Sequence, residues 1–139
     1  AEYAKSNDVN LLYETLTPFS SNIVNTPQQL VQMLGMLPEN VNGVVDIGQI
    51  AFMKQRLEDY ITLLGNRLAH VHLHDSGLAV HMALGDGNLP IKDYILKLEE
   101  SGYKGFYSFE CNDLRYRKDP QSADEQNLRW LRMNQILEE

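Results

Sequence analysis

Short apolar runs alternate with amphipathic stretches along the chain. Runs rich in β-branched, aromatic and leucine residues cover about residues 9–14, 43–46, 68–73 and 105–110, and each is followed by a pattern of helical spacing. This strict alternation predicts βα units whose strands form one parallel sheet. The runs are mostly apolar on both faces, which is typical of parallel strands that helices cover.

Helix start and stop signals lie between these runs. Residues 26–29 (Thr-Pro-Gln-Gln) form a capping box that begins a helix, and Pro38 ends it. Helices are expected over about residues 56–64, with Gly65 as the C-terminal cap, and over about residues 90–101. Residues 122–125 form a second capping box, which predicts a last helix to about Leu137. Residues 1–5 read as the end of a helix and lack an initiator Met, so we expect a truncated chain.

Each predicted strand closes with a side chain that can bind a metal. These side chains are Glu14, Asp46, His72 and Glu110. In βα folds the functional face lies at the C-terminal ends of the strands, and alternation along each strand places the four side chains on one face. A single strand-end acid is usually a helix cap or a solvated loop residue, but four in four strands favour a common site. Carboxylates with one imidazole suit Mn²⁺, Mg²⁺ or Co²⁺ and do not exclude Zn²⁺.

Composition narrows the classes of partner. Hydrophobic residues make up 43% of the 139 residues and charged residues 22%, which fits one ordinary globular domain. The formal net charge of −7, without a basic stripe, argues against a nucleic-acid partner. No apolar run approaches the length that spans a bilayer, so no membrane association is expected. The single cysteine, Cys111, excludes a disulfide within the chain and favours a reducing, cytoplasmic location.

Several short motifs, taken in order, resemble a known family. They are residues 12–16 (Leu-Tyr-Glu-Thr-Leu), 44–49 (Val-Val-Asp-Ile-Gly-Gln), 70–75 (His-Val-His-Leu-His-Asp), His81 with 85–88 (Gly-Asp-Gly-Asn), and 102–110 (Gly-Tyr-Lys-Gly-Phe-Tyr-Ser-Phe-Glu). The chain is similar to the xylose-isomerase-like barrel superfamily, and most similar to its sugar phosphate isomerase/epimerase branch, which includes ketose 3-epimerases, inosose dehydratases and hydroxypyruvate isomerases. The resemblance covers nearly the whole chain.

This resemblance implies an α/β fold in which residues 1–139 form one domain. The domain would be the C-terminal half of a (β/α)₈ TIM barrel, with four consecutive βα units corresponding to strands 5–8. The resemblance further implies metal ligation by Glu14, Asp46, His72 and Glu110. In the epimerases of this family the two glutamates also serve as the acid/base pair on opposite faces of the substrate, which makes Glu14 and Glu110 the proton-transfer candidates.

The same resemblance suggests residues for substrate binding and leaves the substrate open. His81 would line the pocket. Gln49 stands where the family often has a His, and its amide can hydrogen-bond a substrate hydroxyl. The family's epimerases also tend to carry an Arg a few residues after the metal-binding His, but residues 76–80 contain none. The expected substrate is therefore a sugar or a sugar phosphate without further definition.

Two roles are possible for each of several other polar residues near the strand ends. His74 and Asp75 are expected to be hydrogen-bonding or capping groups, although either could touch substrate. Arg115 lies in a basic stretch with Arg117 and Lys118, which is either a solvated charge run or a binding site for a substrate phosphate. The remaining three are expected to pack inside the protein: His70 as a satisfied core histidine, Cys111 as a small buried hydrophobe and Trp130 on the last helix.

A four-stranded sheet covered by helices on one face leaves the other face bare. That face is expected to expose Leu12, Val44, His70 and Phe106, together with two unpaired sheet edges. Large apolar patches and open edges drive association. We therefore expect a homo-oligomer, or association with the missing half of a barrel.

These observations leave three functions open. The first is a metal-dependent sugar or sugar-phosphate isomerase/epimerase, in which the metal stabilises an enediolate and a carboxylate moves a proton between adjacent carbons. The second is a non-catalytic fragment with no assembled metal site. The third is a relative of the apurinic-site endonucleases of the same superfamily, which use a multi-zinc cluster with an extra Asp-x-His pair. Here that place reads Ala-Val-His at residues 79–81, and Gln49 replaces another zinc-binding His.

Overall fold

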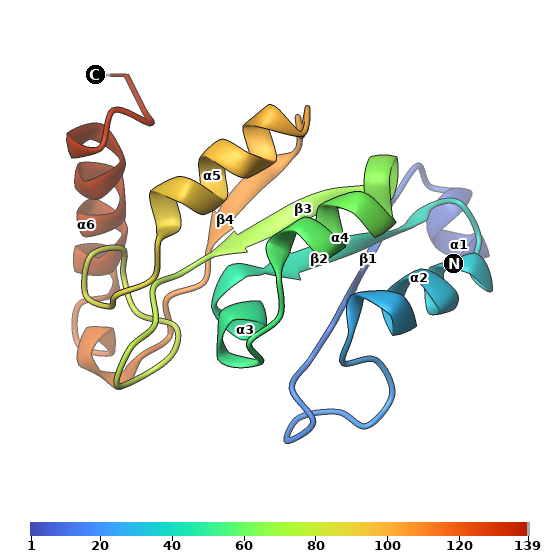
Figure 1. The fold of residues 1–139 in the computed structure, drawn as a ribbon, viewed down its shortest axis with the longest axis horizontal. Helices are drawn as coiled ribbons and strands as arrows, with labels where there is room; N and C mark the ends of the chain where they lie inside the picture. Colours follow the sequence, from blue (N-terminus) through green and yellow to red (C-terminus); the bar gives the residue numbers. More distant parts are fainter. Residues whose placement is uncertain (139) are drawn as a thin grey trace.

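A four-stranded parallel sheet with helices against one face forms the centre of the computed structural model, which describes residues 1–138 (Figure 1). The strands pair in sequence order, β1-β2-β3-β4. They are β1 (Leu11–Glu14), β2 (Val41–Asp46), β3 (Leu68–Leu73) and β4 (Phe106–Phe109). The predicted parallel α/β sheet is therefore confirmed, with β1 and β4 shorter than predicted and β2 beginning two residues earlier.

The helices follow the strands as predicted, with one addition. They are α1 (Glu2–Lys5), α2 (Pro27–Gly35), α3 (Ile47–Phe52), α4 (Leu57–Leu64), α5 (Ile91–Glu100) and α6 (Pro120–Met133), with short 3₁₀ turns at Gly65–Arg67 and Leu114–Tyr116. The capping box at Thr26 is present, because its side chain accepts from the Gln29 amide and the Gln29 side chain accepts from the Thr26 amide. No helix within residues 1–138 is long and apolar enough to cross a membrane.

The bounds of α6 and the existence of α3 correct the sequence prediction. The cap of α6 is Asp119, whose side chain accepts from the Ser122 amide, so the predicted capping box at Ser122 is not the helix start. The helix ends at Met133 rather than near Leu137, and Gln135 just beyond it takes a positive φ of +60°. Helix α3 was not predicted. It begins directly after β2, where the Asp46 side chain accepts from the Gln49 amide.

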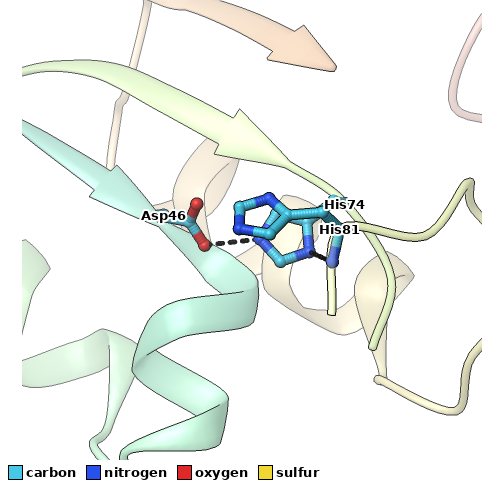
Figure 2. A group of neighbouring side chains, drawn as sticks. All are labelled: Asp46, His74 and His81. Carbon is cyan, nitrogen blue, oxygen red and sulfur yellow. Dashed lines mark hydrogen bonds and ion pairs between the residues drawn. The ribbon is translucent and has the colours of Figure 1, made fainter. Parts of the chain in front are cut away.

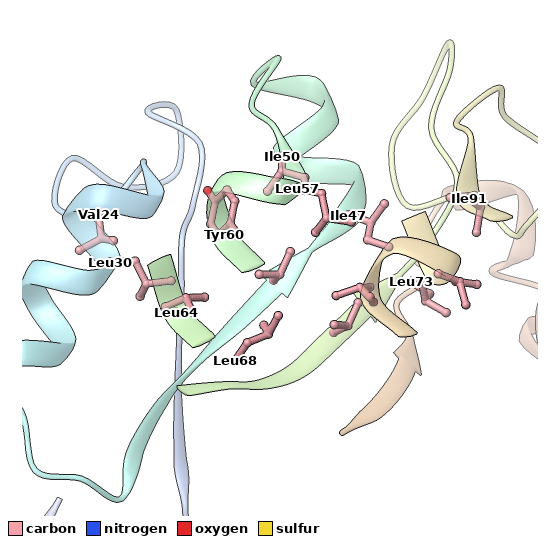
Figure 3. Packing of buried hydrophobic residues seen from close by; sticks show 14 of the residues in the cluster. Val24, Leu30, Ile47, Ile50, Leu57, Tyr60, Leu64, Leu68, Leu73 and Ile91 are labelled. Carbon is pink, nitrogen blue, oxygen red and sulfur yellow. The ribbon is translucent and has the colours of Figure 1, made fainter. Parts of the chain in front are cut away.

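The hydrophobic core lies between the sheet and helices α2, α4 and α5 (Figure 3). Val45, Val71 and Leu73 contribute from the sheet, and large side chains such as Leu30, Leu57, Tyr60, Leu64, Ile91 and Leu98 contribute from the helices. Each large apolar side chain buried in this way stabilises the fold by about 1.5–3 kcal/mol. The hydroxyl of Tyr60 also bonds to Thr15, just past the end of β1, at 3.1 Å. The core therefore holds the C-terminal end of β1 in place.

The opposite sheet face is open, as predicted, but not at every position. Phe106 and Leu12 are 82% and 45% exposed. Val44 is only 3% exposed, which contradicts the prediction. It lies between Glu14 and His70 in the strand register, and these longer side chains flank it on both sides. His70 is only partly buried and bonds to the Ser108 hydroxyl at 2.8 Å, so it is satisfied but is not a core residue.

An irregularity in register decides which β3 residues face the site. Gly43 pairs with Leu68, but Val44 pairs with His70, so Ala69 is an extra residue on β3. Leu68 therefore packs into the core, although it has the same sequence parity as His70. From Val44 onward the register is regular and aligns Asp46 with His72 at the C-terminal edge of the sheet.

Candidate metal centre

The four strand-end residues converge at one edge of the sheet. Glu14, Asp46, His72 and Glu110 each offer one ligand atom, and these atoms all lie within 4.8 Å of one another. The Nδ1 atom of His72 is 3.3 Å from Glu14 Oε1 and 3.1 Å from Glu110 Oε2. The structure thus brings together all the residues that the sequence proposed as ligands, each from a different strand end.

This cluster contains polar atoms without a well-aligned hydrogen bond. Asp46 Oδ2, His72 Nδ1 and Glu110 Oε2 are buried, and within residues 1–138 none of them makes such a bond, so the 3.3 and 3.1 Å approaches of His72 to the two glutamates are ion-pair contacts. Buried polar atoms without partners are costly and rare in folded proteins. Three carboxylates around one imidazole also concentrate negative charge, and carboxylate oxygens with an imidazole nitrogen are suitable ligands for divalent cations. The residues present therefore fit a divalent metal ion.

Asp46 is the most buried member of the cluster. Its Oδ1 atom accepts two hydrogen bonds, from the Gln49 backbone amide at 2.7 Å and from His74 Nε2 at 2.8 Å. Burial by itself would raise the pKa of Asp46, but the His74 hydrogen bond and charge and the Gln49 amide outweigh it, so the pKa is lowered. Asp46 is therefore held as a carboxylate, with both donors on the same oxygen.

His74 and His81 form a stacked pair behind this carboxylate (Figure 2). Their ring centroids are 4.2 Å apart, and His74 has no exposed surface. The backbone amide of His81 donates to His74 Nδ1 at 3.1 Å, and His81 Nδ1 donates to the Glu110 carbonyl at 3.1 Å. Asp46, His74 and His81 also lie close enough together to hold a metal. However, both ring nitrogens of His74 already have protein partners, so this set is a hydrogen-bonded support for Asp46.

The charges within the cluster shift the proton affinities of its members. Burial, and then the neighbouring Asp46, raise the pKa of Glu110. The adjacent Glu14 carboxylate raises the pKa of His72 against the opposing effect of burial. Both shifts favour protons on the cluster in the absence of a cation. A bound cation and these protons would therefore compete for the same atoms.

A cavity of about 420 Å³ opens over the two glutamates. Its lining comprises Glu14, Leu16, Thr17, Phe19, Ser20, Gln49, Phe52, His74, Val80, His81 and Glu110. The predicted substrate residues Gln49 and His81 are thus at the cavity, and the amide of Gln49 donates to Glu14 Oε1 at 3.4 Å. Sequence reasoning did not single out Phe19 and Phe52, although both lie in the segments that directly follow strand-end ligands, which is where barrel enzymes place pocket residues.

Arg115 lies away from this cavity. Its guanidinium is 3.4 Å from Asp86 and 3.0 Å from Asp113, and it stands over the ring of Tyr116 at 5.8 Å. Arg115 is not among the residues that line the cavity. The structure therefore does not bring this predicted phosphate-binding residue to the metal cluster.

Asp75 organises the loop that carries His81. It is buried, and its Oδ1 accepts from the amides of Ser76 and Leu89, while its Oδ2 accepts from the amide of Gly85. Asp75 is thus a hydrogen-bonding group within the loop, which is the first of the two roles expected from the sequence. Two further residues also pack as predicted: Cys111 is half-buried, and Trp130 lies against the core.

Comparison with known proteins places the chain in a family. The model of the xylose isomerase-like TIM barrel family matches residues 1–133. Fructoselysine 3-epimerase of Escherichia coli O157:H7 is 29% identical over 122 residues, which cover 86% of this chain and 44% of that protein. An uncharacterized protein of Methanocaldococcus jannaschii is 26% identical over 119 residues, covering 82% of this chain and 41% of that protein. The chain thus spans less than half the length of these relatives.

Solved structures show the same fold. L-ribulose 3-epimerase superposes with a TM-score of 0.79 at 21% identity, covering 96% of this chain and 49% of that one. D-allulose 3-epimerase from Methylomonas sp. gives a TM-score of 0.78 at 21% identity, covering 98% of this chain and 51% of that one. Both likenesses concern the fold, and both extend over about half of the larger barrel. Since the family model also matches nearly all residues, the chain belongs to the xylose isomerase-like TIM barrel family.

Proposed function

We propose that this chain is part of a metal-dependent sugar or sugar-phosphate isomerase/epimerase and supplies its metal centre, corresponding to strands 5–8 of the barrel. The observation that carries the proposal is the convergence of Asp46 Oδ2, His72 Nδ1 and Glu110 Oε2, all buried and without a well-aligned hydrogen bond within residues 1–138, beside a cavity. The relationship to fructoselysine 3-epimerase supports the reaction class. The single cysteine supports a reducing, cytoplasmic setting.

Glu14, Asp46, His72 and Glu110 would hold one divalent ion, and the chemistry of these ligands suits Mn²⁺, Mg²⁺, Co²⁺ or Zn²⁺. When bound, such an ion supplies a Lewis acid that polarises a carbonyl or hydroxyl oxygen of the sugar. Asp46 is placed as a permanent ligand, because its carboxylate is buried and stabilised by the donors His74 and Gln49.

The two glutamates are suited to proton transfer because they lie on different strand ends and line the same cavity. One carboxylate takes the proton from the carbon beside the sugar carbonyl, and the electrons of that C–H bond form an enediolate. The other carboxyl group returns a proton to the opposite face of the carbon, and the carbonyl re-forms with inverted configuration. The raised pKa of Glu110 allows this group to hold a proton closer to neutral pH than an ordinary glutamate.

The cavity lining favours an unphosphorylated sugar. Gln49 and His81 would bind substrate hydroxyls, and Phe19 and Phe52 offer apolar surface to the carbon skeleton. None of the lining residues is Lys or Arg, and Arg115 is paired with two acids elsewhere. A phosphate group would therefore have to find its cation outside the described part of the cavity. His74, also predicted to bind substrate, would act through Asp46, because it has no exposed surface.

We also propose that the open sheet face is covered in the working protein, either by a second copy or by four further βα units. The exposure of Phe106 and Leu12 on that face supports this association, since large exposed apolar side chains favour binding. Closure of the sheet would also supply the rest of the cavity wall around the substrate.

Metal binding tests the proposal most directly. The purified chain would be titrated with Mn²⁺, with metal content measured by mass spectrometry, beside Glu110→Gln and the exposed control Glu100→Gln. One ion per chain, lost in Glu110→Gln and kept in the control, supports the proposal and justifies an epimerase screen of the full-length protein on ketoses. Absence of binding would favour the non-catalytic alternative, and more than one zinc per site would favour the endonuclease alternative.

A further inference from the structure

We propose that His74 is a positioning residue that fixes the orientation of the Asp46 carboxylate and so keeps Asp46 Oδ2 free for a cation. The consequence for the cation rests on the proposed metal site, whereas the orientation of Asp46 in the metal-free chain does not. His74 is buried, and its Nε2 donates to Asp46 Oδ1 at 2.8 Å.

The hydrogen-bond donors to Asp46 are distributed unevenly over the two oxygens of its carboxylate. Both protein donors to Asp46, the Gln49 amide and His74 Nε2, reach the same oxygen. The other oxygen is buried and has no hydrogen-bond partner among the residues that the structure describes. A helix cap alone needs only one oxygen and leaves the carboxylate able to rotate and exchange its two oxygens. A second donor on Oδ1 opposes that rotation, because rotation would break both hydrogen bonds at once.

The His74 imidazole is in turn held by contacts at its other nitrogen, Nδ1. His74 Nδ1 lies 3.1 Å from both the His81 backbone amide and the Asp75 carbonyl, and because the Asp46 carboxylate can only accept, the proton on Nε2 faces Asp46. His81 takes a left-handed backbone conformation, with φ of +56°, that is uncommon for a residue other than glycine. Its own Nδ1 donates to the Glu110 carbonyl. The ring of His74 is therefore oriented by the same loop residue that contacts a second strand-end ligand.

Space around the ring supports the same role. Gly48, in the first turn of α3, faces the His74 imidazole so closely that any Cβ at this position would overlap it. His81 stacks on the ring at 4.2 Å. A side chain confined by packing and bonded through both nitrogens can hold its partner in one geometry, which is what groups behind a metal ligand do.

Two substitutions of His74 test the hydrogen bonds of its two ring nitrogens separately. In His74→Gln the side-chain amide nitrogen reaches about as far as Nε2 and can still donate to Asp46. In His74→Asn the amide reaches only as far as Nδ1, so it can accept from the His81 amide but cannot reach Asp46. His70→Gln is the matched control, because it removes a nearby imidazole, on β3 itself, whose partner is the Ser108 hydroxyl and not Asp46.

The first measurement is the orientation of the Asp46 carboxylate about its Cβ–Cγ bond in the metal-free chain, from high-resolution crystal structures of the variants. We expect one orientation in the wild-type chain, His74→Gln and His70→Gln, and a rotated or multiply oriented carboxylate in His74→Asn. The wild-type orientation in His74→Asn would show that the Gln49 cap is sufficient and would overturn the proposal. If His74→Asn does not fold, a rotated carboxylate in His74→Gln would overturn it equally.

The second measurement is Mn²⁺ affinity by calorimetry. We expect His74→Asn to weaken binding by about 10- to 100-fold, as is usual for the loss of a group behind a metal ligand, and His74→Gln to retain most of it. In an Asp46→Asn background the His74 effect should disappear. An equal loss in both backgrounds would contradict the positioning role. If the wild-type chain binds no Mn²⁺, the proposed metal site fails, and the orientation of the Asp46 carboxylate alone decides the role of His74.

Discussion

Gly48 and His74 approach so closely that no side chain other than hydrogen fits at position 48. Gly48 lies in the regular helix α3 and has no positive φ, so the requirement for glycine comes from the space that the imidazole occupies. Asp46 caps the start of helix α3, and His74 bonds to the same aspartate. The position of the helix, the orientation of the imidazole and the direction of a proposed metal ligand are thus set together.

The first prediction concerns this contact. Gly48→Ala should lower the free energy of unfolding by about 1–3 kcal/mol, because an added methyl group in a packed site forces its neighbours apart. It should also weaken Mn²⁺ binding, because the displaced His74 can no longer donate to Asp46. Chemical denaturation and calorimetry measure the two effects. The control is Gly35→Ala, where no atom lies within 4 Å of the added methyl group and where we expect unchanged or slightly higher stability. Equal stability of the two variants would refute the prediction.

The second prediction concerns Asp75. Asp75→Asn replaces one acceptor oxygen by a donor, so at least one of the amides of Ser76, Gly85 and Leu89 loses its partner in a buried position. We expect a loss of about 1–3 kcal/mol in the free energy of unfolding. We also expect faster hydrogen exchange at Gly85 and Leu89, measured by NMR. Asp93→Asn, at an exposed position in α5, is the control and should leave both quantities unchanged. Unaltered exchange in Asp75→Asn would contradict the role of Asp75 in the loop.

The positions of the four strand-end residues follow from local sequence pattern. Alternation along a strand and the shared edge of parallel strands are both short-range rules, and they suffice to place Glu14, Asp46, His72 and Glu110 on one side of one edge. They succeeded even at β3, because the extra residue Ala69 precedes the part of the strand that carries His72. An irregularity nearer the strand end would have moved His72 to the other face.

The residues around the ligands depend on contacts that are distant in sequence. His74 reaches Asp46 across 28 residues, and Arg115 reaches Asp86 across 29, so neither partner is implied by its own neighbours in the chain. Helix α3 did have a local signal, since Asp46 and Gln49 stand three residues apart as in a capping box. Interpreting Asp46 only as a ligand hid this second role. One carboxylate both caps the helix and faces the cluster.

The third prediction concerns proton binding by His72 in the metal-free chain. Its pKa should lie above the ordinary value of 6.5, chiefly because of the adjacent Glu14 carboxylate, and it should fall in Glu14→Gln. A raised pKa means that the folded state binds the proton more tightly than the unfolded state. Protonated His72 therefore stabilises the folded state fully at a pH below the pKa that His72 has in the unfolded chain. This stabilisation is lost as the pH rises through the pKa of His72 in the folded chain. NMR titration of the imidazole measures the shift, and the same titration of His70, whose pKa is lowered mainly by burial, is the internal comparison. An unchanged His72 titration in Glu14→Gln would rule out this coupling.

The fourth prediction concerns the open face of the sheet. Phe106 is 82% exposed at the start of β4, and Leu12 is exposed on β1, at the opposite edge, so the apolar surface reaches both edges. If this face drives association, Phe106→Ser should shift the chain towards monomer in sedimentation equilibrium without lowering its stability, because an exposed side chain contributes little to the core. Leu78→Ser is the matched control, since Leu78 is fully exposed but lies in the loop after β3 rather than on the sheet. If Leu78→Ser shifts the chain towards monomer more than Phe106→Ser does, the contact between copies lies in that loop and not on the sheet face. A monodisperse wild-type monomer would mean that the bare face alone does not hold two copies together, and that the remaining half of a barrel must cover it.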